Sequence, residues 1–336
     1  MHSQHIISTF ATLFCAVRLA AAYTIEDTFD ASNFFNEFEF FTAADPTNGF
    51  VSYTSAATAN TTGLAGYLDG AVFLGVDHTT VNPTGSGRAS TRVSSNKTYN
   101  HGLFIADIAH MPGGICGVWP AFWLVGGPSW PNQGEIDIIE GVNDYATNQM
   151  TLHTSAGCTM SGTGAASTSK VLTSNCNSGN GYTGCGTSTS DTQSYGAGFN
   201  QNNGGVYAME WTSDAIQIYF FPRSAIPADI TSGNPTPATW GAPMASFIGG
   251  SGCNIDQHFV NQQIIFDTTF CGDWAGKVWT QSPTCAPLAS TCNAYVSANP
   301  SAFDTAYWQI NSVKVYQNST TPAKSRSLGI ATLFTA

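Results

Sequence analysis

Short β-rich runs recur along this sequence, and residues that favour turns stand between them. Valine, isoleucine, phenylalanine, tyrosine and threonine fill the runs, whereas glycine, proline, asparagine and serine separate one run from the next. Helical periodicity is nearly absent, and no repeat of roughly 20–50 residues is present. The clearest runs are 71–76, 102–108, 121–125, 135–140, 206–211, 215–221, 263–266 and 307–316. Many short strands joined by turns predict an all-β sandwich.

Charged side chains are scarce in this chain of 336 residues, because they make up only 9% of the composition. An ordinary soluble domain carries roughly 25%. The net charge of −11 argues against binding nucleic acid by neutralising phosphates and against a polybasic membrane anchor. Aromatic residues at 12% supply enough apolar surface for a folded core, and no apolar run approaches the roughly 18 residues of a membrane span. We therefore expect an uncharged polymeric substrate and no nucleic-acid or membrane partner.

The first 22 residues have the pattern of a secretory signal peptide. Ile6 to Val17 is an apolar stretch, and Ala20-Ala21-Ala22 is a small-residue cleavage pattern. A buried N-terminal helix is the alternative, but nothing in the segment caps such a helix or patterns it into a core. We predict a signal peptide at 1–22, one catalytic β-sandwich domain at 23–319 and a flexible tail at 320–336.

Cysteine usage and glycosylation motifs agree with secretion. Cys15 leaves with the signal peptide, and the remaining eight cysteines are an even number that predicts up to four disulfides of undetermined pairing. They are Cys116, Cys158, Cys176, Cys185, Cys253, Cys271, Cys285 and Cys292. Three of them lie in the long Gly/Ser/Thr/Asn-rich stretch 155–205, so we expect disulfides to staple that stretch. Because acceptor sequons also begin at Asn60, Asn96 and Asn318, we expect a secreted extracellular glycoprotein.

Three carboxylates, Glu135, Asp137 and Glu140, are interleaved with isoleucines in one of the β-rich runs. In a strand, Glu135 and Asp137 point to one face and the isoleucines beside them to the other. Strict alternation puts Glu140 on the isoleucine face, but one extra residue near Ile138–Ile139, a β-bulge, returns it to the side of the other two. We therefore predict that a bulge places all three carboxylates on one face, as bulges next to active sites often redirect side chains.

Crowded carboxylates of this kind suit the hydrolysis of glycosidic bonds. Two Glu side chains leaning toward each other can reach the carboxyl separation of about 5–5.5 Å found in retaining glycosidases. Asp137 is too short to reach the same substrate atom, but it can raise the pKa of a neighbouring glutamate so that one carboxyl stays protonated. A solvated strand face and a calcium site are the alternatives, although Ile-rich β sequence is a poor source of roughly six to eight oxygen ligands. We interpret Glu135, Asp137 and Glu140 as catalytic and expect no metal ion.

Tryptophans cluster just before the carboxylates. Trp119 and Trp123 are four residues apart and share a face if the run is extended, and Trp130 follows. A flat indole with one N–H donor suits stacking on a sugar ring. Burial in the sandwich core is the alternative for at least one of the three. His153 begins the next strand candidate, where it is either a hydrogen-bond donor beside the carboxylates or an ordinary histidine with no special role.

The motif Glu-Ile-Asp-Ile-Ile-Glu at 135–140, preceded by Trp-Pro-Ala-Phe-Trp-Leu at 119–124, closely resembles glycoside hydrolase family sixteen. The resemblance is to its laminarinase-like branch of fungal secreted endo-β-1,3(4)-glucanases, and it extends from about residue 28 to residue 317. Further matching pieces lie at 87–93, 206–211, 271–276 and 308–313. The resemblance implies a concanavalin A-like β-jelly-roll sandwich with a substrate cleft on its concave sheet.

The same resemblance implies roles for individual residues. Glu135 is the implied nucleophile, Glu140 the acid/base and Asp137 their helper. The residues implied to line the sugar subsites are Trp119, Trp123, Trp130, His153, Arg92 and Trp274. Arg92 rests on a looser match, in which Thr91 replaces the more usual valine.

These observations predict a secreted, monomeric retaining endo-glycosidase that hydrolyses β-1,3 or mixed β-1,3/1,4-glucans without a cofactor. A cell-wall transglycosylase on the same site is one alternative, because the difference lies in the acceptor subsites. A non-catalytic carbohydrate-binding lectin is another, although a lectin has no use for three crowded carboxylates. A purely structural cell-wall protein explains neither the tryptophans nor the carboxylates.

Overall fold

A computed structural model describes residues 23–179 and 183–318 of the chain, so the predicted signal peptide and tail lie outside the described residues. Two large antiparallel sheets of eight strands each account for most of the described strands, together with one short parallel pair. Every β-rich run predicted from the sequence lies wholly or mostly in a strand. The all-β prediction is therefore confirmed.

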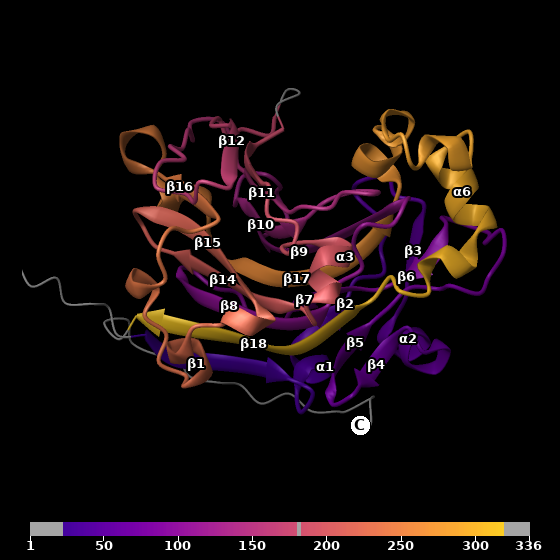
Figure 1. The fold of residues 1–336 in the computed structure, drawn as a ribbon, viewed down its shortest axis with the longest axis horizontal. Helices are drawn as coiled ribbons and strands as arrows, with labels where there is room; N and C mark the ends of the chain where they lie inside the picture. Colours follow the sequence, from indigo (N-terminus) through magenta and orange to yellow (C-terminus); the bar gives the residue numbers. More distant parts are fainter. Residues whose placement is uncertain (1–22, 180–182, 319–336) are drawn as a thin grey trace, which may run out of the picture.

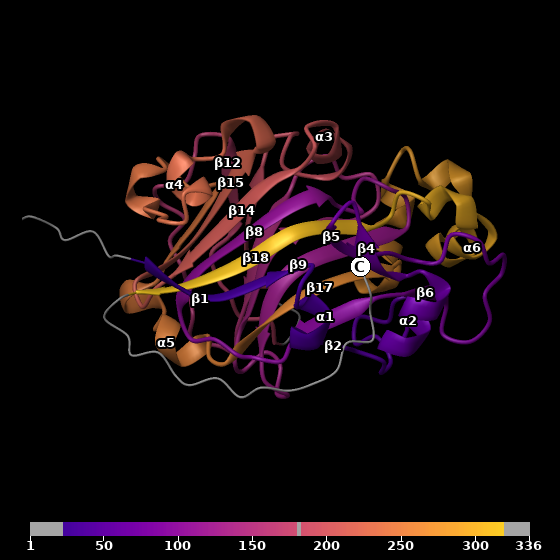
Figure 2. The same ribbon diagram turned by 90° about the horizontal axis from the view of Figure 1, so that it is seen from below.

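The first sheet is built around one long C-terminal strand. Its strands are β1 (Tyr23–Asp30), β4 (Ala65–Leu68), β5 (Ala71–Leu74), β8 (Gly102–His110), β14 (Gly205–Trp211), β15 (Ala215–Pro222), β16 (Ala245–Ile248) and β18 (Trp308–Asn318). Their order is β16-β15-β14-β8-β18-β5-β4, and β1 pairs with the part of β18 that β5 leaves free. Figure 2 shows β1, β18, β8, β14 and β15 side by side in this sheet.

The second sheet carries the predicted catalytic strand near its centre. Its strands are β2 (Phe38–Phe40), β7 (Arg92–Ser95), β9 (Val118–Gly126), β10 (Glu135–Glu140), β11 (Gln149–His153), β12 (Ser169–Thr173), β13 (Cys185–Thr189) and β17 (Gln262–Phe270). Their order is β12-β13-β11-β10-β9-β17-β7-β2. Figure 1 shows β10, β9 and β17 stacked above β14, β8 and β18. The parallel pair is formed by β3 (Val51–Tyr53) and β6 (Arg88–Ser90).

Helices are short and connect the strands. They are α1 (Phe34–Glu37), α2 (Ala56–Thr62), α3 (Gly196–Gln201), α4 (Ala228–Thr231), α5 (Ile255–His258) and α6 (Cys292–Ala298). Single helical turns lie at Arg223–Ala225, Pro237–Thr239, Gly250–Gly252, Gly272–Gly276, Trp279–Gln281, Ala286–Leu288 and Pro300–Phe303. Helix α2 begins at the Ser55 cap, whose hydroxyl accepts from the Thr58 N–H, and ends at Gly63 with φ +72°. Among the described residues, no helix has the length and apolar character needed to span a membrane.

The main core lies between the two sheets, and alternation along the strands places it there. In β8, Phe104, Ala106 and Ile108 belong to this core, whereas Leu103 and Ile105 belong to a smaller apolar cluster. Successive side chains of a strand point to opposite faces, so the smaller cluster covers the outer face of the first sheet. The outer face of the second sheet instead carries a cleft, which is lined by residues of β7, β9, β10 and β17.

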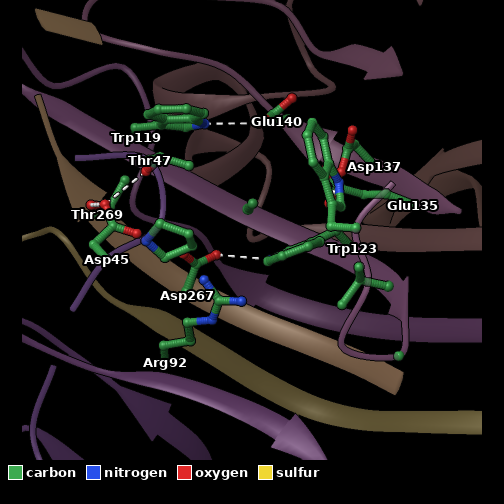
Figure 3. A pocket seen from close by; sticks show the side chains of 15 residues that line it. Asp45, Thr47, Arg92, Trp119, Trp123, Glu135, Asp137, Glu140, Asp267 and Thr269 are labelled. Carbon is green, nitrogen blue, oxygen red and sulfur yellow. Dashed lines mark hydrogen bonds between the residues drawn. The ribbon is translucent and has the colours of Figure 1, made fainter. Parts of the chain in front are cut away.

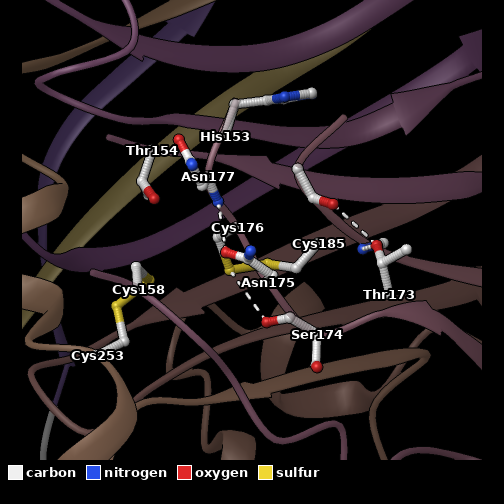
Figure 4. The surroundings of a disulfide bond; sticks show 12 residues. His153, Thr154, Cys158, Thr173, Ser174, Asn175, Cys176, Asn177, Cys185 and Cys253 are labelled. Carbon is white, nitrogen blue, oxygen red and sulfur yellow. Dashed lines mark hydrogen bonds between the residues drawn. A yellow bond between two sulfur atoms is a disulfide. The ribbon is translucent and has the colours of Figure 1, made fainter. Parts of the chain in front are cut away.

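All eight cysteines of the described residues form disulfides, as predicted from their even number. The pairs are Cys116–Cys285, Cys158–Cys253, Cys176–Cys185 and Cys271–Cys292. The first and last tie the helical segment around α6 to the ends of β9 and β17, next to a second apolar cluster that includes Trp279 and Phe303. Cys158–Cys253 ties the stretch 155–205 to the segment before α5, and Cys176–Cys185 closes a loop within the stretch, whose strand β13 pairs with β11. The predicted stapling of this stretch is therefore confirmed (Figure 4).

Candidate active site

Strand β10 pairs with β9 on one side, and this pairing contains the predicted bulge. The register shifts between Asp137 and Ile139, so Ile138 is an extra residue opposite β9. The three isoleucines of β10 are at most 1% exposed and belong to the main core. Glu135, Asp137 and Glu140 all line one cleft on the opposite face. One additional residue therefore turns three carboxylates to the same side of the sheet.

The cleft over this face has a volume of about 320 Å³ and is built by four neighbouring strands. Strand β9 contributes Trp119 and Trp123, β7 contributes Arg92 and β17 contributes Asp267 (Figure 3). Trp130, in the loop before β10, also lines the cleft and is 51% exposed. The alternative that one of these tryptophans is a core residue does not hold for any of the three.

Each of the three tryptophans donates its indole N–H to a carboxylate of the cleft. The pairs are Trp119 Nε1 to Glu140 Oε1 at 2.8 Å, Trp130 Nε1 to Glu135 Oε2 at 2.9 Å and Trp123 Nε1 to Asp267 Oδ1 at 3.0 Å. A hydrogen bond to an ionised carboxylate is stronger than one between neutral groups. The indoles therefore hold the carboxyl groups in place and also stabilise their charge.

His153 lies beside the carboxylates, which agrees with its interpretation as a hydrogen-bond donor to them rather than as an ordinary histidine. It pairs with Glu135 across β10 and β11, and its side chain is 19% exposed. Its Nε2 is 3.3 Å from Asp137 Oδ2 and 3.8 Å from Glu135 Oε1. Its Nδ1 is 2.7 Å from Ser178 Oγ, in the loop that the Cys176–Cys185 disulfide closes. His153 thus links the stapled stretch to the carboxylates.

Burial and mutual repulsion keep protons on the β10 carboxyls. Burial, and then the neighbouring Asp137 carboxylate, raise the pKa of Glu135 to about 8, whereas His153 and the Trp130 N–H oppose this rise. Burial also raises the pKa of Glu140 well above its usual range, and Asp137 and Glu135 add to the effect. The pKa of Asp137 is raised as well, first by burial and then by Asp267. The group therefore retains protons near neutral pH, as an acid catalyst requires.

Asp267, which β17 contributes to the same cleft, has different surroundings. It accepts from Trp123 Nε1 and, at 3.0 Å, from the Tyr53 hydroxyl. Arg92 stands nearby, its guanidinium 4.5 Å from the Phe41 ring centre and 4.9 Å from that of Trp123. Burial raises the pKa of Asp267 to about 6, and Arg92 and the two donors limit the rise. This end of the cleft therefore favours an ionised carboxylate beside a cation.

Sequence reasoning missed Asp267 and its neighbour Asp45. Asp45 also lines the cleft, and its Oδ2 accepts from the Thr47 hydroxyl at 2.7 Å and from the Thr269 hydroxyl at 3.1 Å. A signal for Asp267 was present, because it is a single carboxylate directly after the apolar run 263–266. Asp45 lies in an irregular segment between β2 and β3, where strand alternation offers no signal.

Trp274 occupies a position next to the cleft rather than in its lining. Its ring packs edge-on against Trp119, with ring centres 5.7 Å apart, and against Tyr145 at 5.9 Å. Its predicted contact with sugar stays a prediction. The geometry shows that Trp274 supports the indole that donates to Glu140.

Glu135, Asp137 and His153 could together hold a metal ion, because one ligand atom of each lies within 4.8 Å of the others. The set offers two carboxylates and one imidazole, whereas calcium takes roughly six to eight oxygens. Glu135 also already accepts a hydrogen bond from Trp130. The expectation of a metal-free site stays a prediction, which a chelator can test.

Comparison with known proteins gives a consistent result. The family model described as "XgeA-like, catalytic GH16 domain" matches residues 38–316. An endo-1,3(4)-beta-glucanase of Arthroderma benhamiae is 48% identical over 310 residues, which cover 91% of this chain and 67% of that protein. A probable endo-1,3(4)-beta-glucanase of Aspergillus fumigatus is 46% identical over 323 residues, covering 94% of this chain and 48% of that protein. The chain spans about half the length of most of the curated relatives it matches.

Two solved structures resemble the whole sandwich. An elongating GH family 16 beta-1,3-glucosyltransferase is 46% identical, with a TM-score of 0.82, and Laminarinase 16A from Phanerochaete chrysosporium is 45% identical, with a TM-score of 0.81. Each match covers 88% of this chain and 100% of the other, which confirms the predicted jelly-roll sandwich. Since the family model spans most of the chain and its relatives share nearly half of its residues, the chain belongs to glycoside hydrolase family 16, within the XgeA-like group.

Proposed function

We propose that this protein is a secreted retaining endo-β-glucanase that hydrolyses β-1,3 or mixed β-1,3/1,4-glucans. The observation that carries the proposal is the bulge in β10, which brings Glu135, Asp137 and Glu140 onto one face of the cleft. Relatives are named endo-1,3(4)-beta-glucanases, and the Laminarinase 16A structure is described with beta-glucans in donor and acceptor sites. A tryptophan-lined cleft suits such uncharged sugar chains, because flat indoles can stack on sugar rings.

The proposed reaction is a double displacement at the anomeric carbon. Glu140, whose pKa is raised by burial, gives its proton to the glycosidic oxygen as the bond from that oxygen to the anomeric carbon breaks. The Glu135 carboxylate forms a bond to the same carbon, which yields a covalent glycosyl-enzyme. Glu140, now ionised, takes a proton from water, and the water oxygen displaces Glu135 with net retention.

The surrounding residues have proposed supporting roles. The Trp130 N–H and His153 oppose the rise in the pKa of Glu135 and so favour the ionised carboxylate that acts as the nucleophile. Asp137 holds the pKa of Glu140 high through its own nearby charge. We assign the faces of Trp123 and Trp119, together with the Arg92 guanidinium, to sugar binding, because all three line the cleft.

The stereochemistry of the product tests the proposal directly. Laminarin or lichenan is mixed with the protein, and the first reducing ends are followed by proton NMR before mutarotation. We expect the β-anomer to appear first, because two displacements restore the original configuration. An α-anomer appearing first contradicts the assignment of Glu135 as nucleophile. A protein that binds glucan but releases no reducing ends favours the lectin alternative.

Transfer to a sugar acceptor is the second candidate for the same site. It is favoured by the similarity to a structure described as an elongating beta-1,3-glucosyltransferase. In that reaction a sugar hydroxyl replaces water in attacking the glycosyl-enzyme, so the carboxylate chemistry is unchanged. Sizing the products of laminari-oligosaccharides separates the two, because only transfer makes products longer than the substrate.

We further propose an extracellular, monomeric enzyme that needs no metal or cofactor. Four disulfides suit an oxidising compartment. The three carboxylates supply the acid, the base and the nucleophile, so the proposed reaction has no step that requires an ion. Activity that survives dialysis against EDTA supports this part, and activity that calcium or zinc restores after EDTA contradicts it.

A further inference from the structure

The bulge in β10 leaves backbone groups of that strand without their usual partners. On the β11 side, strand pairing runs from Glu135 through Asp137 and stops there. The Ile138 carbonyl and the Glu140 N–H lie beyond that point, in a strand whose isoleucines are almost fully buried. A buried peptide group without a hydrogen bond costs free energy, so a bulge persists only where other groups supply the missing partners.

The side chain of Asn148 supplies both partners. Its Oδ1 accepts from the Glu140 N–H at 2.9 Å, and its Nδ2 donates to the Ile138 carbonyl at 2.7 Å. Asn148 is 0% exposed and directly precedes β11. An asparagine amide carries one acceptor and one donor group side by side, as a peptide group does, so it can replace a piece of the strand ladder.

Asn148 is itself fixed by the end of the stapled stretch 155–205. Its N–H donates to Ser194 Oγ at 3.2 Å, and its carbonyl accepts from the Thr189 N–H at 3.2 Å. The Ser194 hydroxyl in turn donates to the Asp191 carbonyl at 2.6 Å. Backbone and side chain of Asn148 are therefore both held, and its amide has no freedom to leave the bulge.

We propose that Asn148 is a positioning residue for the acid/base: its amide completes the backbone at the bulge and thereby keeps the Glu140 side chain on the cleft face. The inference rests on the proposed function of Glu140. Asn148 is buried and does not line the cleft, so it acts only through Glu140. In this view the stretch 155–205 contributes to catalysis through Ser194, without contacting the substrate.

The proposal predicts a selective defect. When Glu140 is misplaced, protonation of the leaving oxygen suffers most for natural β-glucan, because a sugar alkoxide is a poor leaving group. In an aryl β-laminaribioside whose leaving group is dinitrophenolate, that group departs without being protonated. The glycosylation step on that substrate therefore depends little on Glu140, whereas it depends on Glu135 as strongly as before.

Asn148→Ala and Asn148→Asp test the proposal, with kcat/KM measured on laminarin and on the aryl substrate. Asp keeps the shape and the acceptor for the Glu140 N–H but loses the donor to the Ile138 carbonyl, so it covers the case in which Ala does not fold. We expect each foldable variant to lose roughly 10- to 100-fold on laminarin and less than about 5-fold on the aryl substrate. The loss on laminarin should appear in kcat rather than in KM.

Asn200→Ala is the matched control. The Asn200 side chain makes the same double contact with the backbone of Met111, with both distances 3.0 Å, but lies away from the cleft lining. We expect this control to lower the unfolding temperature while leaving the ratio of the two substrates unchanged. Equal losses on both substrates in Asn148→Ala, or no loss on either, overturn the proposal.

Amide hydrogen exchange provides a readout that needs no activity. The Glu140 amide should exchange faster in Asn148→Ala than in the wild type, relative to amides of β17, because its acceptor is gone. If the wild type cleaves neither substrate, the proposed function fails. Faster exchange at Glu140 then still supports the structural half of the inference, and unchanged exchange overturns it.

Discussion

Two groups of buried carboxyls share one cleft but are built in opposite ways. On β10, Glu135, Asp137 and Glu140 line the cleft together, and the Asp137 carboxylate raises the pKa of both glutamates. On β17, Asp267 stands next to the guanidinium of Arg92. The pKa is raised to about 8 for Glu135 but only to about 6 for Asp267, although burial is the leading cause in both. Burial raises a carboxyl pKa at either end, and the charge of the neighbours decides by how much.

This contrast predicts different roles for the β10 carboxyls and for Asp267 with Arg92. The β10 group keeps protons that it can give to a leaving group, whereas Asp267 is suited to hold a charge that orients Trp123 and balances Arg92. We propose that the bond-breaking chemistry takes place at the β10 carboxyls and that Asp267 and Arg92 help to hold the substrate. Variants at each end should therefore separate kcat from KM.

The largest effect is expected from Glu135→Gln and Glu140→Gln. Each should lower kcat/KM on laminarin by roughly 10³-fold or more, because Gln is neither a nucleophile nor an acid. On an aryl β-laminaribioside, azide should restore turnover to both Ala variants but with opposite product configuration. Glu140→Ala should give the β-glycosyl azide, because azide displaces Glu135 from the glycosyl-enzyme, and Glu135→Ala should give the α-glycosyl azide, because azide attacks the substrate directly. If either Gln variant loses no more than Asp267→Asn does, the distinction between the two ends fails.

The next effect is expected from Asp137→Asn, at roughly 10- to 100-fold in kcat. The Asp137 charge helps to hold the pKa of Glu140 above its usual range, so its removal lowers that pKa. Glu140 then loses its proton at lower pH, and the alkaline limb of the profile of kcat/KM against pH moves to lower pH. A limb that stays in place or moves upward contradicts the proposed coupling.

Asp267→Asn should act on binding. Asn can still accept from Trp123 or from Tyr53, but it leaves Arg92 without a counter-charge, so KM for laminarin should rise roughly 10-fold while kcat changes less than about 3-fold. Asp256→Asn is the control, because Asp256 pairs with His101 outside the cleft lining. A loss confined to kcat places Asp267 with the β10 group instead.

A smaller effect is expected on stability, and its sign follows from the raised pKa values. Folded Glu135 keeps its proton to about pH 8, whereas the unfolded chain releases it near the usual value of 4.5. Between these values the folded state binds more protons, so the free energy of unfolding falls as pH rises. Asp267 acts in the same direction between 3.8 and about 6.

Denaturant unfolding at pH 5 and pH 8 measures this slope. Glu135→Gln should flatten it and, at pH 8, should be more stable than the wild type by about 1 kcal/mol, because burial disfavours the ionised Glu135 carboxylate and a neutral amide avoids this cost. A Glu135→Gln variant with the wild-type slope indicates that Glu135 ionises normally in the folded protein.

The smallest effect is expected from Ser178→Ala, a loss of a few-fold in kcat. The Ser178 hydroxyl is the partner of His153 Nδ1, and the other ring nitrogen faces Asp137 and Glu135. Without Ser178 the imidazole can adopt a different tautomer or tilt away from the carboxylates. Ser178→Thr, which keeps the hydroxyl, should retain full activity, and an equal loss in both variants contradicts a role for the hydrogen bond.

Several features followed from the sequence because they depend on neighbours along the chain. Alternation places the isoleucines of β10 in the core, and the spacing of Glu135, Asp137 and Glu140 requires one extra residue if all three are to share a face. The even cysteine count predicted the number of disulfides. These features follow from the alternation of side chains along a strand and from the pairing of an even number of cysteines.

Other features required the folded chain. The approach of Asp267 to Trp123, the pairing of Cys116 with Cys285 and the contact of Asn148 with the bulge join residues that no sequence interval marks. Their partners are set by which strands become neighbours in the sheet, and strand order is decided by burial of the whole core. The sequence by itself therefore determined which residues could do chemistry. The tertiary structure decided which groups surround these residues, and burial and neighbouring charges then set the pKa of each carboxyl.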